Sequence, residues 1–144
     1  MASYYSGDIL IVDEGIIVHQ VNLKGSMGAG IALSIKNKYP SVEKEYLEWV
    51  REAKLGDVLF SKINEKLYIA NLAGQINYAG LGVKTSYDAY EKASPLLEKF
   101  SLETKLQLFF PDRIGACLAG GNRDRIHSIL EKHISKVNYV IYQI

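Results

Sequence analysis

Apolar and polar residues along the chain follow two kinds of pattern, one typical of strands and one typical of helices. Runs rich in β-branched and aromatic residues predict strands, and they cover residues 3–12, 15–22, 58–63, 67–75, 105–111 and 137–144. Residues 13–15 are the predicted turn between the first two strands. The polar stretch at 64–66 predicts a turn between the third and fourth strands, which we expect to pair with each other.

Four other stretches place apolar residues on one face of a helix. The first begins near Gly30 and is stopped by Pro40, which disfavours helix in the residue before it. We expect Ser41 to cap the second helix, and Thr85 with Asp88 to form a capping box for the third. A loop with Gly80 and Gly82 precedes that third helix. The fourth helix covers residues 123–134 and is expected to bury Ile126, Ile129, Leu130 and Ile134.

The alternation of strands and helices predicts an α/β fold, in which a mixed, largely parallel sheet is covered by helices on both faces. The chain has 144 residues, of which 48% are hydrophobic and 23% charged, so we expect a single domain over residues 1–144. Its net charge of +1 gives no strong field for nucleic acid or for an anionic membrane, and we expect a monomer.

The chain carries one cysteine, Cys117, which excludes an internal disulfide. Its first residues lack a basic segment followed by a long apolar run, so the sequence predicts no secretory signal. No apolar run approaches the length of a membrane span. We therefore expect a protein of the reducing cytoplasm.

Two glycine-rich segments, GSMGAG at residues 25–30 and GACLAGG at residues 115–121, each follow a predicted strand and open a predicted helix. There, unpaired backbone N–H groups and the helix dipole can cradle a phosphate, and ligands of open α/β sheets bind outside the carboxyl ends of strands. The glycine spacing of the first segment is the reverse of the dinucleotide fingerprint, and the chain has no P-loop motif. One such segment would most simply be a tight turn, but two favour a diphosphate held from both sides.

Further motifs extend along nearly the whole chain. In order they are GDI at 7–9, HQVN at 19–22, MGAGIALSIKNKYP at 27–40, IANLAGQ at 69–75, TSYDAY at 85–90 and RIGACLAGGN at 113–122. This set resembles the macrodomains, and more narrowly the branch that holds ADP-ribose 1''-phosphate phosphatases, terminal ADP-ribose glycohydrolases and the macrodomain antitoxins that remove ADP-ribose from DNA. The resemblance implies a three-layer α/β/α fold with an ADP-ribose cleft.

The resemblance also implies roles for individual residues. Asp8 would accept a hydrogen bond from the adenine amino group, Ile9 would lie beside the adenine ring, and Asn22 would face the distal ribose. The residues implied to line the phosphates and the distal ribose are Met27, Gly28, Ala29, Gly30, Ile31, Ala32, Gln75, Ile114, Gly115, Ala116, Cys117, Leu118, Ala119, Gly120 and Gly121. From the residues alone, Asp8 could equally satisfy a turn, and the Asn22 amide could tie loop backbone groups together.

The chain departs from the glycohydrolases of this branch at their catalytic positions. Gln75 stands where those enzymes carry a lysine, Ala119 where they carry an aspartate, and Asn122 where many relatives carry an aspartate. None of these side chains can replace a nucleophilic lysine or an acidic partner. We therefore predict hydrolysis of a small derivative such as ADP-ribose 1''-phosphate, with Asn22 and Gln75 as candidate catalytic residues.

Three alternatives stay open beside this prediction. The first is a reader that binds free or protein-linked ADP-ribose without chemistry, and the second is an ADP-ribosyl hydrolase with atypical catalytic residues. The third is a binder of another nucleotide or sugar phosphate on the same fold, because a fold does not determine a substrate.

Other reactive residues are expected to have structural roles. Cys117 has no histidine near it in the sequence and is expected to fill space. His19 lies within an apolar run and is expected to be a core residue bonded to backbone. His127 and His133 are too poorly matched on a helix face to share a metal, so we predict no metal site and no cofactor.

Two further positions carry broader expectations. Tyr78 either covers the distal ribose or decorates the surface. Residues 123–125 are expected to form the solvated start of the last helix.

Overall fold

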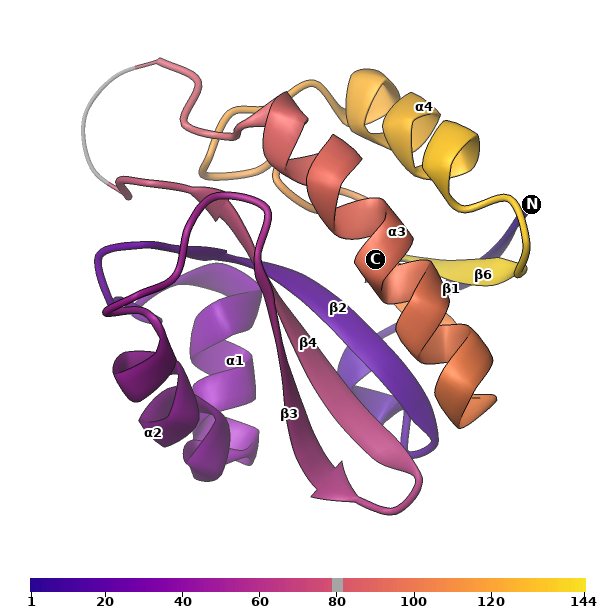
Figure 1. Cartoon of the computed structure of the whole chain (residues 1–144), viewed down its shortest axis with the longest axis horizontal. Helices are drawn as coiled ribbons and strands as arrows, with labels where there is room; N and C mark the ends of the chain where they lie inside the picture. Colours follow the sequence, from indigo (N-terminus) through magenta and orange to yellow (C-terminus); the bar gives the residue numbers. More distant parts are fainter. Residues whose placement is uncertain (79–81) are drawn as a thin grey trace.

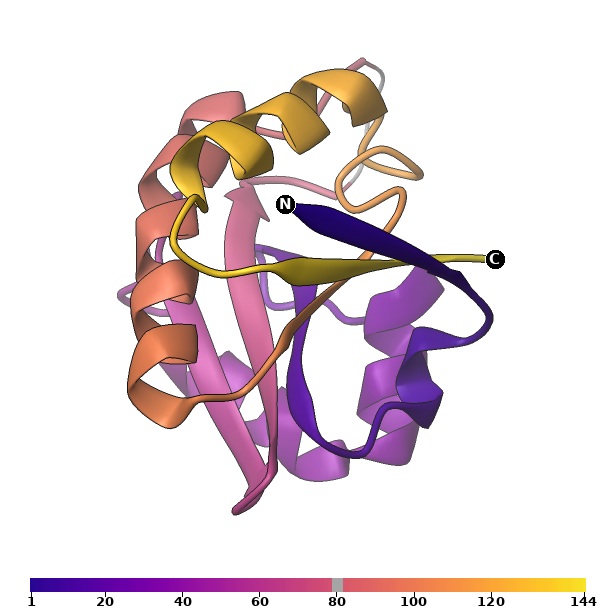
Figure 2. The same cartoon turned by 90° about the vertical axis from the view of Figure 1, so that its right-hand side faces the viewer.

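In a computed structural model, which describes residues 1–78 and 82–144, the strands form one sheet in the order β1-β6-β5-β2-β4-β3 (Figure 1, Figure 2). The strands are β1 (Ala2–Ser6), β2 (Gly15–Asn22), β3 (Val58–Asn64), β4 (Leu67–Gln75), β5 (Leu108–Pro111) and β6 (Tyr139–Gln143). All neighbours are parallel except β3 and β4, which form the predicted antiparallel pair. The prediction of a mixed, largely parallel sheet is confirmed.

Helices cover both faces of this sheet, which gives the three-layer α/β/α fold (Figure 1). One layer holds α1 (Gly30–Lys38) and α2 (Pro40–Trp49), and the other holds α3 (Tyr87–Thr104) and α4 (Arg123–His133). Strand β2 supplies side chains to both cores, because Ile17 packs with the α1 and α2 side and Ile16 with the α3 and α4 side. Burial on both faces explains why the sequence of β2 is mostly apolar rather than alternating between apolar and polar residues. None of the described helices is both long and apolar enough to cross a membrane.

The first predicted strand is wrong over its second half. Strand β1 ends at Ser6, and the chain turns at Gly7, whose φ of 137° an L side chain rarely adopts. Residues Ile9–Ile11 then form a short 3-10 helix, η1, with Asp8 as its N-cap. The predicted turn at residues 13–15 therefore does not join two neighbouring strands. Strand β1 is an edge strand that pairs only with β6.

Two predicted helix caps are also wrong, by two residues in α2, whose N-cap is Tyr39, and by one residue in α3. Helix α2 begins at Pro40 rather than after a Ser41 cap, because the fixed φ of proline suits the first turn of a helix. The N-cap of α3 is Ser86, whose Oγ accepts from the Ala89 N–H at 3.2 Å. The Thr85 hydroxyl donates instead to the carbonyl of Gly115. Gly80, predicted to lie in the preceding loop, is outside the described residues.

The remaining helix predictions agree with the structure. Helix α1 ends just before Tyr39 and Pro40. Ile126, Ile129 and Leu130 of α4 and its C-cap, Ile134, are buried as predicted.

Candidate functional site

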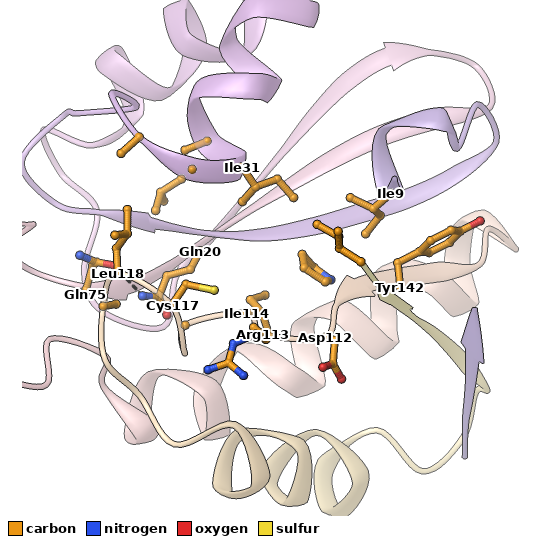
Figure 3. A pocket seen from close by; sticks show the side chains of 18 of the residues that line it. Ile9, Gln20, Ile31, Gln75, Asp112, Arg113, Ile114, Cys117, Leu118 and Tyr142 are labelled. Carbon is orange, nitrogen blue, oxygen red and sulfur yellow. Dashed lines mark hydrogen bonds between the residues drawn. The ribbon is translucent and has the colours of Figure 1, made fainter. Parts of the chain in front are cut away.

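A cavity of about 900 Å³ opens at the carboxyl ends of β2, β4, β5 and β6 (Figure 3). Both glycine-rich loops line it. Ile9 and Tyr142 lie at one end of the close-up view, and Gln20 and Gln75 lie at the other, with Ile31 and Ile114 facing each other between them. The cavity is therefore elongated, and its two ends offer different chemistry.

The first wall of the cavity is the N-terminus of α1. Its N-cap is Ala29, which has no side-chain oxygen to accept from the first turn. The N–H groups of Gly30, Ile31 and Ala32 therefore have no partner within the helix, and these three residues line the cavity. Free N–H groups at the positive end of a helix dipole favour a bound anion.

The second wall is the loop between β5 and α4. Among the described residues, no acceptor lies within hydrogen-bonding distance of the N–H groups of Cys117, Leu118 and Ala119, and all three residues line the cavity. The loop is held from behind at the Gly115 carbonyl, which accepts from the Gly121 N–H at 2.9 Å and the Thr85 hydroxyl at 2.6 Å. Glycine is required at position 121, because an added Cβ would lie 2.5 Å from that carbonyl oxygen. Two sets of N–H groups that donate to no described residue thus belong to residues lining one cavity.

Asn22 organises the first glycine loop through its carboxamide. Its Oδ1 accepts from the N–H groups of Lys24 at 3.0 Å and Ser26 at 3.2 Å, and its Nδ2 donates to the Ser26 carbonyl at 2.8 Å. The Tyr46 hydroxyl of α2 also donates to this residue, and burial raises the pKa of Tyr46 to about 12. These contacts match the interpretation of Asn22 as a residue that ties loop backbone together. Asn22 also lines the cavity, so its contact with a distal ribose stays a prediction.

The end of the cavity near Gln75 is built from neutral groups. Gln20 Nε2 donates to Gln75 Oε1 at 2.6 Å and to Thr85 Oγ1 at 3.1 Å, and Gln20 Oε1 accepts from the Tyr90 hydroxyl at 2.7 Å. Burial raises the pKa of Tyr90 well above its usual value, so this hydroxyl keeps its proton. Gln75 in turn donates to the Asn77 carbonyl.

Only two charged side chains, Asp112 and Arg113, belong to the described lining of the cavity. Asp112 is engaged by Arg123, whose Nε lies 3.0 Å from both carboxylate oxygens, and this guanidinium lowers the pKa of Asp112. Arg123 is thus paired rather than simply solvated, which corrects the expectation for residues 123–125. Arg113 forms no ion pair with any described residue, so it leaves one uncompensated cation on the lining.

Most of the predicted ligand-binding residues lie on the cavity lining. They are Ile9, Asn22, Gly28, Ala29, Gly30, Ile31, Ala32, Gln75, Ile114, Gly115, Cys117, Leu118 and Ala119. Five lie off the lining, namely Asp8, Met27, Ala116, Gly120 and Gly121. Asp8 Oδ1 accepts from the Leu10 N–H at 2.9 Å, and Met27 and Ala116 are buried in the cores of the two helical layers. Contact of these residues with a ligand stays a prediction.

The lining residues that the sequence analysis did not single out include Gln20, Arg113 and Tyr142. Gln20 is one of three polar residues in a strand that is otherwise apolar, which is a signal of a polar contact at a buried position. Tyr142 is the penultimate residue of the last strand, at the carboxyl edge of the sheet, where ligands of such sheets bind. Arg113 directly precedes the second glycine loop, and nothing in its spacing singled it out.

Of the residues expected to have structural roles, His19 is buried in the core and Cys117 is exposed. His19 is fully buried, as expected, but its Nε2 lies 2.7 Å from the side chain of Asn71 rather than from backbone. Burial lowers the pKa of His19 to about 4. Cys117 is exposed on the cavity lining and does not fill core space, and Tyr78 is also exposed there. Within residues 1–78 and 82–144, no three histidine, cysteine or acidic side chains form a cluster suited to a metal.

Sequence comparison gives one relative over nearly the full length. No protein-family profile matches the chain. An uncharacterised 17.5 kDa protein of Enterobacteria phage T4, from the tk-vs intergenic region, is 32% identical over 152 aligned positions, which cover 98% of this chain and 95% of the phage protein. A DNA ADP-ribosyl glycohydrolase of Mycobacterium tuberculosis is 38% identical over 63 residues, but this match covers 44% of the chain and 17% of the glycohydrolase.

Solved structures similar to the chain include macrodomains and a protein of unknown function. A protein of unknown function from Bacteroides thetaiotaomicron has a TM-score of 0.91 and 27% identity over 100% of this chain and 98% of its own. The macrodomain of Mycobacterium tuberculosis DarG has a TM-score of 0.82 and 23% identity, over 99% of this chain and 97% of its own. Thermosipho africanus DarTG, solved in complex with ADP-ribose, has a TM-score of 0.82 and 15% identity, over 99% of this chain and 41% of its own. The chain therefore belongs to the same family as the phage T4 protein, and its fold is that of the macrodomains.

Proposed function

We propose that the protein binds ADP-ribose in the cavity between its two glycine-rich loops. The observation that carries this proposal is the pair of free N–H sets, Gly30–Ala32 on one wall and Cys117–Ala119 on the other. Each set can donate to one phosphate of a diphosphate, and the Arg113 cation adds favourable charge. The solved complex of Thermosipho africanus DarTG with ADP-ribose supports the same ligand for this fold.

The two ends of the cavity suit the two ends of this ligand. Ile9 and Tyr142 offer an apolar and aromatic surface for adenine, while Gln20 and Gln75 offer hydrogen bonds to the hydroxyls of the distal ribose.

For chemistry, we propose slow hydrolysis of a substituent on the distal ribose, with ADP-ribose 1''-phosphate as the first substrate to test. Asn22 would act by holding the first glycine loop and a water near the distal ribose, since its carboxamide spans the loop. Gln75 would contact the same ribose. Loss of a phosphate needs no attack by a protein nucleophile at the anomeric carbon, so this cavity could support it without a lysine.

A second candidate is the removal of ADP-ribose from DNA, which is favoured by the match to the mycobacterial DNA ADP-ribosyl glycohydrolase. Against it, the described lining near Gln75 carries no lysine or acidic side chain that could replace the catalytic pair inferred for such enzymes. A reader without activity is the third outcome that the same assay distinguishes.

Calorimetry with ADP-ribose, AMP and NAD tests the binding proposal. Gly28 lines the cavity, and its backbone accepts a side chain, so Gly28→Val should fold and weaken ADP-ribose at least about tenfold by crowding the diphosphate. Ser34→Val, on the exposed face of α1, which follows Gly28 in the chain, is the matched control and should bind normally. Equal affinity of the two folded variants would contradict the proposal.

Turnover assays on ADP-ribose 1''-phosphate and on ADP-ribosylated DNA then separate the candidates. We expect phosphate release from the first substrate, slowed more than binding is weakened by Asn22→Ala, and no release from the second. Robust cleavage of the DNA substrate would establish the second candidate, and binding without either reaction would establish the reader.

A further inference from the structure

The neutral end of the cavity is a closed chain of hydrogen bonds whose direction is fixed from both ends. The Gly115 carbonyl can only accept, so the Thr85 hydroxyl donates to it at 2.6 Å and must accept from Gln20. Both N–H groups of Gln20 are then used, one on Thr85 and one on Gln75 Oε1. The Asn77 carbonyl can also only accept, so Gln75 turns its Nε2 toward that carbonyl.

The backbone around Gln20 is shaped to admit this side chain. A Cβ at Gly115 would lie 2.8 Å from Gln20 Oε1 and 2.9 Å from the Tyr90 hydroxyl oxygen, and a Cβ at Gly74 would also collide with Gln20. The register of β2 and β4 shifts at this point, because Val21 pairs with Ala73 and Asn22 pairs with Gln75. Gly74 is the extra residue, and the bulge brings Gln75 beside Gln20.

This arrangement leaves one N–H of Gln75 without a partner among the described residues, on a side chain that lines the cavity. The end of the cavity therefore offers a ligand a fixed, uncharged donor. A lysine would offer a mobile cation, and a carboxylate would offer only acceptors.

We propose that Gln75 donates this N–H to an oxygen on the distal ribose or its 1''-substituent, and that Gln20 is the positioning residue that holds Gln75 in the donating orientation. The inference rests on the proposed binding of ADP-ribose and deepens it by assigning specificity. The preferred substrate class carries an oxygen acceptor, such as a phosphate, at this end. A site built around one hydrogen bond discriminates against ligands that cannot complete it.

The first test compares two ligands, ADP-ribose 1''-phosphate and ADP, which lacks the distal ribose. Gln75→Leu and Gln20→Leu should each weaken ADP-ribose 1''-phosphate about tenfold and leave ADP within about twofold. Gln107→Leu is the matched control, because Gln107 is exposed and donates to the Asn138 carbonyl away from the cavity. A merely structural role would weaken both ligands equally, and that result would overturn the inference.

The second test uses Gln75→Glu, which keeps the shape and the acceptor for Gln20 but removes the donor. At about pH 7.5 this variant should bind ADP-ribose 1''-phosphate about thirtyfold or more weaker than wild type, because a carboxylate would face a phosphate. The ratio of variant to wild-type affinity should recover as the pH falls toward about 5, since a protonated carboxyl donates again. Gln75→Leu should show no such recovery, and the ratio at each pH removes the titration of the ligand itself.

The outcomes separate this inference from the proposed function. If wild type binds neither ADP nor ADP-ribose 1''-phosphate, the proposed function fails and the inference with it. If wild type binds both and the Gln75 variants bind them equally well, only the inference is overturned.

Discussion

Strands β2 and β4 carry two polar pairs side by side on opposite faces. His19 and Asn71 face the α1 and α2 side and are fully buried, while Gln20 and Gln75 face α3 and lie on the cavity lining. Both pairs join a side chain of β2 to a carboxamide of β4 at 2.6–2.7 Å.

The difference lies in what the remaining hydrogen-bonding groups do. Asn71 donates to the Leu59 carbonyl and to Ser61 Oγ, so its amide is consumed by strand β3. Gln75 keeps one N–H that no described residue accepts. The same chemistry therefore contributes to stability on one face and is available for a ligand on the other, because burial determines the cost of an unmade hydrogen bond.

The largest expected effect in this comparison is the loss of unfolding free energy when Asn71 is substituted. Asn71→Leu leaves His19 and the Leu59 carbonyl without their buried partners, so we expect the free energy of unfolding to fall by about 4 kcal/mol. Gln75→Leu should lower it by about 1 kcal/mol or less, since water reaches that amide. Urea denaturation measures both, and equal losses would contradict the assignment of different roles to the two faces.

A second, smaller effect is the pH dependence that His19 confers. The pKa of His19 is about 4 in the folded protein and about 6.5 when unfolded, so the unfolded chain binds the proton more readily between these values. The contribution of neutral His19 to the free energy of unfolding is fully present above about pH 6.5. It should fall by about 3 kcal/mol as the pH drops to about 4. His19→Gln is the control, and its unfolding free energy should lack this component. An identical pH profile for the two proteins would refute the buried neutral histidine.

The third prediction concerns the support of the second glycine loop by Thr85. Thr85→Val removes the hydrogen bond to the Gly115 carbonyl without changing side-chain shape, so ADP-ribose should bind about fivefold more weakly, or about 1 kcal/mol. Thr104→Val removes a similar bond to the Phe100 carbonyl in α3 and should leave binding unchanged. Calorimetry on the pair decides whether the hydroxyl acts on the cavity or only on the fold.

The smallest expected effect is a gain in stability at Lys105, a position remote from both polar pairs that serves as a reference for the other variants. Lys105 caps α3 with a φ of 61°, a conformation that favours glycine. Lys105→Gly should raise the free energy of unfolding by about 0.5 kcal/mol and change neither ligand affinity nor pH dependence. A loss of stability would show that contacts of the lysine outweigh the backbone preference.

Much of the fold could be predicted because local patterns and tertiary packing agree. Strand β4 matches its predicted bounds, and α1 stops before Pro40 as its residues require. The run at 3–12 could not be divided correctly from periodicity, since Gly7 decides the break through its backbone angle. Thr85 resembled a cap, yet its hydroxyl serves a loop 30 residues away.

The walls of the cavity could be predicted because glycine spacing and the resemblance to macrodomains point to the same two loops. The role of Gln20 could not, because it depends on a register shift at Gly74 and on Tyr90, which is 70 residues away in sequence. Asn22 was left with two interpretations, and its contacts with Lys24 and Ser26 support the loop-tying one.

The position of β1 at the sheet edge has a consequence for how the chain folds. Residues 2–6 pair with residues 139–143, so more than 130 residues must be synthesised after β1 before this strand finds its neighbour. The end of the cavity formed by Ile9 and Tyr142 is therefore completed last, after the inner strands and both helical layers have a scaffold on which to assemble. A nascent chain can thus form its two glycine-rich loops before it completes the end of the cavity where we propose that adenine binds.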